Sequence, residues 1–153
     1  MPKTAYTDGA CRVSNPGQCS CAWVLYDGAE EKAWGGTYLG PELHSNNYAE
    51  YQGVLRLLRW LHEQKITDVV IHCDSKLVVN QVNQEWSAEN KPELRKFMVE
   101  AYGLLTVGHH RIVHVRGHGG KANATDNDRN GYADAICNRI LDEKGFNVNS
   151  KRN

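Results

Sequence analysis

The segment Thr4-Ala5-Tyr6-Thr7-Asp8-Gly9-Ala10 is the part of this 153-residue sequence around which the rest is organised. Its threonines, its tyrosine and its alternating apolar positions are typical of a short β-strand, and it places one carboxylate, Asp8, just before a glycine. An Asp-Gly pair most often marks a turn, so this segment alone indicates little. It becomes informative because further acidic residues follow, each at a junction between expected secondary-structure elements.

Length and composition indicate an ordinary globular domain. A chain of 153 residues can bury a sizeable core without disulfides or a structural metal, and 41% hydrophobic and 24% charged residues are usual values for such a domain. No apolar run approaches the length of a membrane span, and the start of the chain has no signal-peptide pattern, so we expect a cytoplasmic protein without a membrane association. We predict one domain over residues 1–145 and a polar tail over 146–153.

Charge balance excludes one broad class of nucleic-acid binder. The 18 basic residues equal the 18 acidic residues, so the formal net charge is zero. This argues against a general electrostatic binder of nucleic acid. It does not exclude a nucleic-acid enzyme whose bound cations neutralise the phosphate charge.

The five cysteines are expected to be reduced and mostly to serve in packing, because a cytosolic chain of this size needs no cross-links. Cys19 and Cys21 stand two apart in an apparent strand and would point to the same face. They lack a second Cys/His pair at zinc-ligand spacing, so a structural zinc is not expected.

Strand and helix patterns alternate along the chain. The expected strands cover 4–10, 19–26, 32–39, 68–73 and 111–116, and the expected helices cover 45–64, 76–84, 92–105 and 131–144. The Asp27-Gly28 turn signal makes the first three strands an antiparallel meander. The crossover helix that follows requires strand 68–73 to lie parallel to a meander strand, and we place it beside the first. The predicted class is therefore α/β, with a central five-stranded mixed sheet of an antiparallel meander plus parallel strands, flanked by helices.

Four acidic residues lie at these junctions, and each could instead have an ordinary structural role in a turn or at a helix end. Asp8 could belong to a turn, Asn47-x-x-Glu50 fits a capping box, and Asp74 could cap the helix that follows it. Asp134, placed in the first turn of the last helix, could be an acid near a helix N-terminus. Individually, these explanations are as good as functional ones.

Taken together, the four acids predict a metal centre. Ligands collect at the carboxyl ends of parallel strands, which puts Asp8 and Asp74 side by side, with Glu50 and Asp134 able to project toward the same edge. Like charges at close range oppose folding unless a cation lies between them, and carboxylates suit Mg²⁺ or Mn²⁺. Two such ions would activate a water and stabilise the leaving oxygen in phosphodiester hydrolysis.

The sequence resembles type 1 ribonuclease H over nearly its whole length, from Thr4 to about Leu141. The motifs that carry the resemblance are Tyr6-Thr7-Asp8-Gly9-Ala10, Asn15-Pro16-Gly17, Ser45-Asn46-Asn47-Tyr48-Ala49-Glu50, Asp74-Ser75, Gly117-His118-Gly119-Gly120 and Asn130-x-x-Ala133-Asp134. In this order, on these elements, the set is highly specific. The resemblance implies a ribonuclease H-like fold and an endonuclease that hydrolyses the RNA strand of RNA/DNA hybrids, leaving 5′-phosphate and 3′-hydroxyl ends. It indicates no obligate protein partner, and we expect a monomer.

The resemblance also assigns roles to residues. The metal-binding acids of the family match Asp8, Glu50, Asp74 and Asp134, and its mobile-loop histidine matches His118, which would assist proton transfer or product release. The alternative for His118 is a solvated loop histidine.

Substrate contacts follow from the same resemblance. The residues that would bind the hybrid through its shallow minor groove, where 2′-hydroxyls and phosphates are read without base sequence, are Asn15, Ser45, Asn46 and Asn47. Trp86 would line the channel for the DNA strand, and a core tryptophan is its alternative.

Two departures from the family pattern affect these expectations. The basic protrusion that some members carry after the second helix is missing, which together with the zero net charge predicts weak, salt-sensitive hybrid binding. The spacing from His118 to Asp134 is longer than usual, so Asp128 or Asn127 could take the fourth acidic position, although the helix pattern after Asp134 favours Asp134.

Two other functions share part of this evidence. A DNA strand-transfer or junction-cleaving enzyme of the same superfamily would have the same acids, but it should lack the SNN-x-x-E and Gly-His-Gly signatures. A non-catalytic hybrid-binding module would tolerate the loss of an acid, whereas this chain keeps all four.

Overall fold

The computed structural model describes residues 2–83, 92–115 and 124–146. The strands are β1 (Lys3–Arg12), β2 (Gln18–Asp27), β3 (Glu30–Tyr38), β4 (Val69–Cys73) and β5 (Arg111–His114). The helices are α1 (Asn46–Glu63), α2 (Lys76–Val82), α3 (Pro92–Gly108) and α4 (Ala124–Glu143). No helix within these ranges is both long and apolar enough to cross a membrane.

The strands form one mixed sheet in the order β3-β2-β1-β4-β5. The first three strands are antiparallel neighbours, and a two-residue turn joins β2 to β3 through Gly28, whose φ of +63° suits glycine. β4 lies parallel to β1, and β5 lies parallel to β4. The sequence-based expectation of an antiparallel meander plus parallel strands is confirmed.

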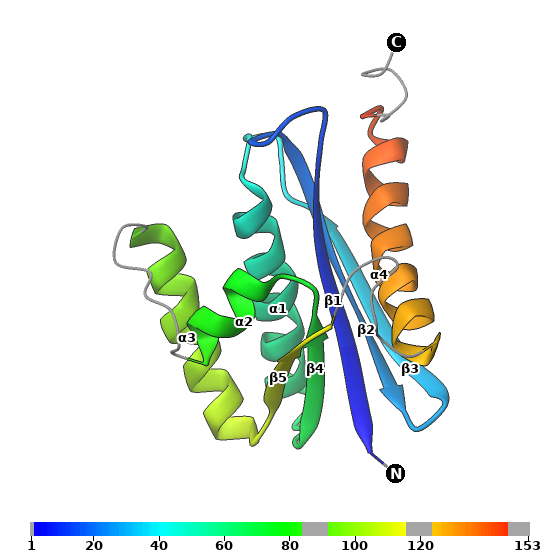
Figure 1. Ribbon diagram of the computed structural model, residues 1–153, viewed down its shortest axis with the longest axis vertical. Helices are drawn as coiled ribbons and strands as arrows, with labels where there is room; N and C mark the ends of the chain where they lie inside the picture. The colour runs from blue at the N-terminus through cyan, green and yellow to red at the C-terminus, as the bar shows by residue number, and fades with distance from the viewer. Residues whose placement is uncertain (1, 84–91, 116–123, 147–153) are drawn as a thin grey trace.

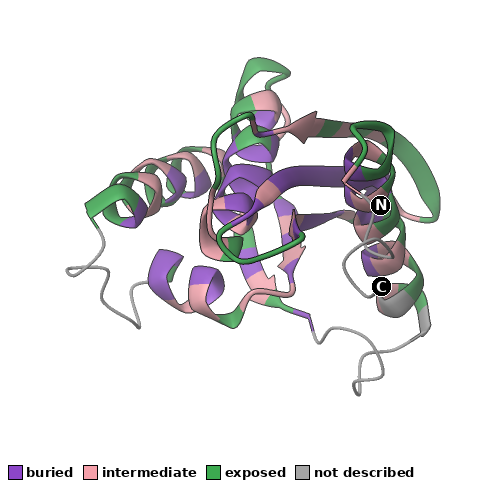
Figure 2. Cartoon of the chain, turned by 90° about the horizontal axis from the view of Figure 1, so that it is seen from above, coloured by how far each residue is buried: buried purple, intermediate pink, exposed green. Residues whose placement is uncertain are grey.

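Helices cover both faces of the sheet, with α1, α2 and α3 on one side and α4 on the other (Figure 1). The core between the sheet and the first three helices includes fully buried Leu55, Leu58 and Ile71. A second core, between the sheet and α4, includes Tyr6 and Val24. Buried residues follow the strands and the helix faces turned toward them (Figure 2). The sheet is therefore packed on both faces, and its strand ends are where a site can form.

Small residues let α1 approach β1 very closely. A Cβ added to Gly9 would lie 2.4 Å from the backbone carbon of Ala49 and 2.4 Å from the backbone nitrogen of Glu50. A Cβ added to Gly53 would lie 2.8 Å from the carbonyl oxygen of Asp8. Because these Cβ atoms are absent, the N-terminal half of α1 packs directly against the part of β1 that carries Asp8.

The last helix begins earlier than predicted. It starts at Ala124 and not at Gly131, so residues expected in a loop form its first two turns. Its early turns are attached to the sheet: Asp126 accepts a hydrogen bond from the Tyr6 hydroxyl, and Arg129 donates to Thr4 Oγ1 at 3.1 Å and to the Gly28 carbonyl at 3.0 Å. Such tertiary contacts override the weak local helix signal of this polar segment.

One cysteine pair corrects the expectation that all five are reduced. Cys11 and Cys19 form a disulfide, because the antiparallel register of β1 and β2 places them directly opposite each other with their Cα atoms 4.2 Å apart. Their spacing in the sequence does not reveal this pairing. The other three cysteines, Cys21, Cys73 and Cys137, are free and buried, as expected of packing residues.

Phe146, the first residue of the expected tail, packs against the body of the protein. Its ring stacks on Tyr38 with centroids 6.1 Å apart, and its carbonyl accepts a hydrogen bond from Arg12 Nη1 at 2.7 Å. The rest of the expected tail, residues 147–153, lies outside the described part of the chain.

Candidate active site

Three of the four predicted acids converge where β1 and β4 run side by side. The β1–β4 register ends with Thr7 opposite Cys73, so the next residues are Asp8, still within β1, and Asp74, directly after the end of β4. Glu50 reaches the same point from α1. Ligand oxygens of Asp8, Glu50 and Asp74 all lie within 4.8 Å of one another.

The structure excludes the turn role considered for Asp8 and the capping-box role considered for Glu50. Asp8 lies inside β1, paired with Ala22 of β2, and is not part of a turn. The N-cap of α1 is Ser45, whose hydroxyl oxygen accepts the Tyr48 N–H, so Asn47 does not cap this helix and Glu50 lies beyond its first turn. Neither acid has a capping or turn role that would account for it.

The same holds for Asp74 and Asp134. The N-cap of α2 is Ser75, whose hydroxyl oxygen accepts the Val78 N–H at 3.2 Å, so Asp74 is not the cap. Because α4 starts at Ala124, Asp134 stands near the middle of a 20-residue helix and not in its first turn. It therefore does not interact with the N-terminal end of a helix dipole, whose effect is confined to the first turn.

Asp134 joins the other acids through Asp8. A side-chain hydrogen bond connects the two carboxyl groups, and the charge of Asp134 contributes to raising the pKa of Asp8. The alternative acid, Asp128, is exposed on α4. The fold thus brings Asp134, and not Asp128, to the other three acids; the side chain of Asn127 is outside the described set.

Burial and mutual repulsion dominate the electrostatics of this cluster. The pKa of Asp8 is raised to about 9, first by burial and then by the charges of Asp74 and Asp134. Burial, followed by the charges of Asp8 and Asp74, also raises the pKa of Glu50. One buried oxygen on each of Glu50 and Asp74 has no hydrogen-bond partner among the described residues.

No described lysine or arginine forms an ion pair with Asp8, Glu50 or Asp74. The basic side chains that do form ion pairs in the described ranges contact other acids, namely Glu30, Glu100, Asp126 and Asp142. Buried carboxylate oxygens without partners are costly, and hard oxygen ligands are those that Mg²⁺ and Mn²⁺ prefer. The donor set and its unpartnered oxygens therefore fit a divalent cation.

The residues expected to contact substrate gather at a neighbouring edge. The β1–β2 loop meets the start of α1, where the side-chain oxygen of Asn15 accepts the backbone N–H of Asn46 at 3.0 Å. Paired backbone hydrogen bonds between Gly17 and His44, at 2.9 and 3.0 Å, hold the two segments together. Ser45 and Asn47 belong to the same helix start. The two remaining predicted residues, His118 and Trp86, lie outside the described residues.

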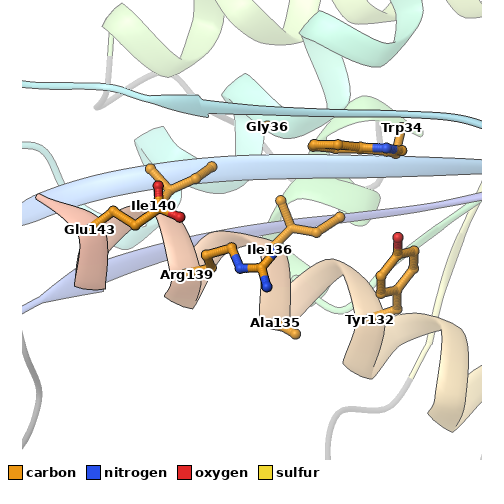
Figure 3. A pocket seen from close by; sticks show the side chains of 8 residues that line it. All are labelled: Trp34, Gly36, Tyr132, Ala135, Ile136, Arg139, Ile140 and Glu143. Carbon is orange, nitrogen blue, oxygen red and sulfur yellow. The ribbon is translucent and has the colours of Figure 1, made fainter.

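A separate groove lies away from the acids. It occupies about 470 Å³ between β3 and α4, and Trp34, Tyr132 and Arg139 are among the side chains that line it (Figure 3). None of the four acids lines this groove. The chemistry of the carboxylate cluster is therefore not built around it.

Sequence reasoning missed residues that shape the site without being acidic. Gly53 allows the close approach of α1, and Asn138 donates to the Asp134 carboxylate at 3.2 Å. The position of Asn138, four residues after Asp134, is the signal that could have revealed it, because such residues are neighbours on a helix surface.

Residues 2–140 match the RNase H family. The chain belongs to the RNase H family. Ribonuclease HI of Halobacterium salinarum is 37% identical over 141 residues, covering 91% of this chain but 64% of that relative. Ribonuclease H of Methylobacillus flagellatus is 33% identical over 150 residues, covering 90% of each chain.

A solved RNase H structure agrees with the fold. The crystal structure of RNase H1 from the halophilic archaeon Halobacterium salinarum superposes with a TM-score of 0.76 at 35% identity, covering 94% of this chain and 99% of that one. The resemblance inferred from the motifs, and the ribonuclease H-like fold that it implies, are both confirmed.

Proposed function

We propose that this protein is a ribonuclease H that hydrolyses the RNA strand of RNA/DNA hybrids, leaving 5′-phosphate and 3′-hydroxyl ends. The observation that carries the proposal is the convergence of Asp8, Glu50 and Asp74 within 4.8 Å, with Asp134 hydrogen-bonded to Asp8. Each of these acids lacks the structural role that would otherwise explain it, and the chain belongs to a family whose curated relatives are ribonucleases H.

The four carboxylates would hold two Mg²⁺ or Mn²⁺ ions. Bound ions of this kind lower the pKa of a water and stabilise the leaving oxygen of a phosphodiester. The charges of both Asp74 and Asp134 act on Asp8, so Asp8 would contribute its carboxylate to the metal centre together with both of them. The partnerless buried oxygens of Glu50 and Asp74 are the ones that an ion would satisfy.

The edge formed by Asn15 and the start of α1 would bind the hybrid. Asn15 uses its side-chain oxygen to hold the Asn46 backbone, which turns its amide nitrogen toward other acceptors such as phosphate oxygens. Ser45 and Asn47 add neutral polar groups suited to 2′-hydroxyls. With few basic contacts and zero net charge, binding should be weak and salt-sensitive.

The remaining roles are carried over from the family pattern. His118 would assist proton transfer or product release, and Trp86 would line the channel for the DNA strand. The protein would act as a monomer without an obligate protein partner.

The proposal is tested with a labelled RNA/DNA hybrid, next to duplex DNA and duplex RNA, in Mg²⁺ or Mn²⁺. We expect cleavage of the RNA strand of the hybrid alone, lost in Asp8→Asn and retained in Asp128→Asn, because Asp128 is exposed and is not among the charges that act on Asp8. Comparable cutting of duplex DNA would instead favour a DNA-processing nuclease. Hybrid binding without cleavage would favour a non-catalytic binding module.

A further inference from the structure

We infer that Asn138 is a positioning residue, which holds the carboxylate of Asp134 in the metal centre, and that buried Arg12 fixes the orientation of the Asn138 amide. The inference rests on the proposed function, because it assigns a role within the same site. It is carried by a continuous chain of hydrogen bonds from Arg12 through Asn138 to Asp134, and from there to Asp8.

The side-chain amide of Asn138 connects Asp134 to Arg12. It stands one helical turn after Asp134, where its Nδ2 group donates to Asp134 Oδ2 at 3.2 Å. Its Oδ1 atom accepts from Arg12 Nη2 at 2.7 Å. Both interactions are made at once by a single side-chain orientation.

Arg12 determines which way the amide points. A guanidinium group only donates hydrogen bonds, so the oxygen of Asn138 must face Arg12 and the NH₂ group must face Asp134. Arg12 is itself held in place: it is 7% exposed, and its Nη1 atom donates to Asp142 Oδ1 at 2.6 Å and to the Phe146 carbonyl at 2.7 Å. With Arg12 absent, the amide could rotate and present its oxygen to the carboxylate.

A neutral donor suits this position for an electrostatic reason. Asp134 is packed beside Asp8, and the two carboxylates repel each other once both are ionised, so another group is needed to hold Asp134 in place. A lysine or arginine in direct contact would hold it but would compete with divalent cations for the same carboxylate. Asn138 supplies the hydrogen bond without a charge, and the charge of Arg12 stays one residue further out.

The test compares Mn²⁺ binding by variants of Asn138 in the full chain, measured by calorimetry without nucleic acid. Asn138→Leu keeps the size of the side chain and adds no charge but removes both polar contacts, and Asn138→Ala also shortens the side chain. Outer partners of metal ligands typically contribute 10- to 100-fold in metal affinity, so we expect both variants to bind Mn²⁺ about 10-fold more weakly. Asn138→Gln, which keeps a donor and an acceptor, should recover most of the affinity.

The matched control is Arg139→Ala. Arg139 is the next residue of α4, is exposed, and lines the groove between β3 and α4 (Figure 3). This variant should bind Mn²⁺ like the wild type. In hydrolysis assays, Asn138→Leu should lower kcat at limiting Mn²⁺ with little change in the KM for the hybrid, and saturating Mn²⁺ should restore most of the rate. A general loss of folding would lower kcat at limiting and saturating Mn²⁺ alike.

Wild-type Mn²⁺ affinity in Asn138→Leu would overturn the inference, as would an equal loss in Arg139→Ala. If Asn138→Ala does not fold, Asn138→Leu still decides the question, because leucine fills a similar space and Arg12 keeps its hydrogen bonds to Asp142 and Phe146. A wild-type protein that binds Mn²⁺ but does not cleave hybrids would refute the proposed function, while the metal titrations would still test the role of Asn138.

Discussion

Replacing Asp8 by asparagine should have two opposite effects, loss of hydrolysis and a gain in the stability of the metal-free protein. Asp8 is 4% exposed and lies among other acids, and its pKa rises from 3.8 to about 9 on folding. Burying Asp8 among like charges therefore lowers the free energy of unfolding of the wild-type protein. A neutral asparagine at this position would remove that destabilisation.

The size and sign of the gain follow from linkage between protonation and folding. The folded state keeps the Asp8 proton at pH values where the unfolded chain has lost it, so the free energy of unfolding falls as the pH rises from about 4 to about 9. At about 1.4 kcal/mol for each pH unit, the cost between pH 3.8 and pH 7 reaches about 4 kcal/mol. Asp8→Asn should thus gain up to about 4 kcal/mol at pH 7 and close to nothing at pH 4.

The assay is urea unfolding followed by far-UV circular dichroism, in a chelator, at pH 4, 7 and 8.5. Asp128→Asn serves as the control, because this exposed acid should change stability by less than about 0.5 kcal/mol at each pH. Adding Mg²⁺ should stabilise the wild type more than Asp8→Asn and so narrow the difference, since an ion that binds only the folded state adds to its stability.

A less stable Asp8→Asn protein at pH 7 in chelator would refute this reasoning. So would a gain that is the same at pH 4 and pH 8.5, because a pH-independent gain cannot come from removing a titrating charge. Either result would mean that the folded protein compensates Asp8 in another way.

Two further predictions concern the surroundings of the cluster. Gly9→Ala would put a methyl group 2.4 Å from the backbone of Ala49, so it should lower the free energy of unfolding by about 2 kcal/mol, as measured by urea unfolding. It should also weaken Mn²⁺ binding, measured by calorimetry, because α1 and its Glu50 would shift. An unchanged stability together with an unchanged Mn²⁺ affinity would show that α1 does not pack tightly against β1 at this point. Reducing the disulfide between Cys11 and Cys19 should lower the free energy of unfolding by about 2 kcal/mol, since the disulfide closes a short loop. The stability of the control variant Cys11→Ser/Cys19→Ser should not change with reductant. Equal stability of the wild type with and without reductant would contradict the pairing.

Much of the fold was predictable because local patterns carry it. The β-branched run ending at Cys73, the turn at Asp27-Gly28 and the proline that opens α3 each depend on nearby residues alone. Those signals also predicted the parallel pairing of β1 and β4, since a crossover helix leaves few other topologies. The juxtaposition of Asp8 and Asp74 then followed from topology.

Exact boundaries and caps were less predictable. Ser45 and Asn47 both fit a helix start in the sequence, and only the path of the chain into α1 made Ser45 the cap. The early start of α4 depends on Arg129, whose partners Thr4 and Gly28 are more than 100 residues away in sequence. Local helix propensity contains no information about partners that are so distant in the sequence.

The sequence by itself determined the elements, their order, the family and the four acids of the predicted metal centre. Tertiary structure alone decided the disulfide between Cys11 and Cys19, excluded the capping and turn explanations for the acids, and formed the bridge from Arg12 through Asn138. The reason is physical: periodicity and turn chemistry act between residues a few positions apart, whereas strand register and the facing of a helix on a sheet depend on the packing of the whole chain.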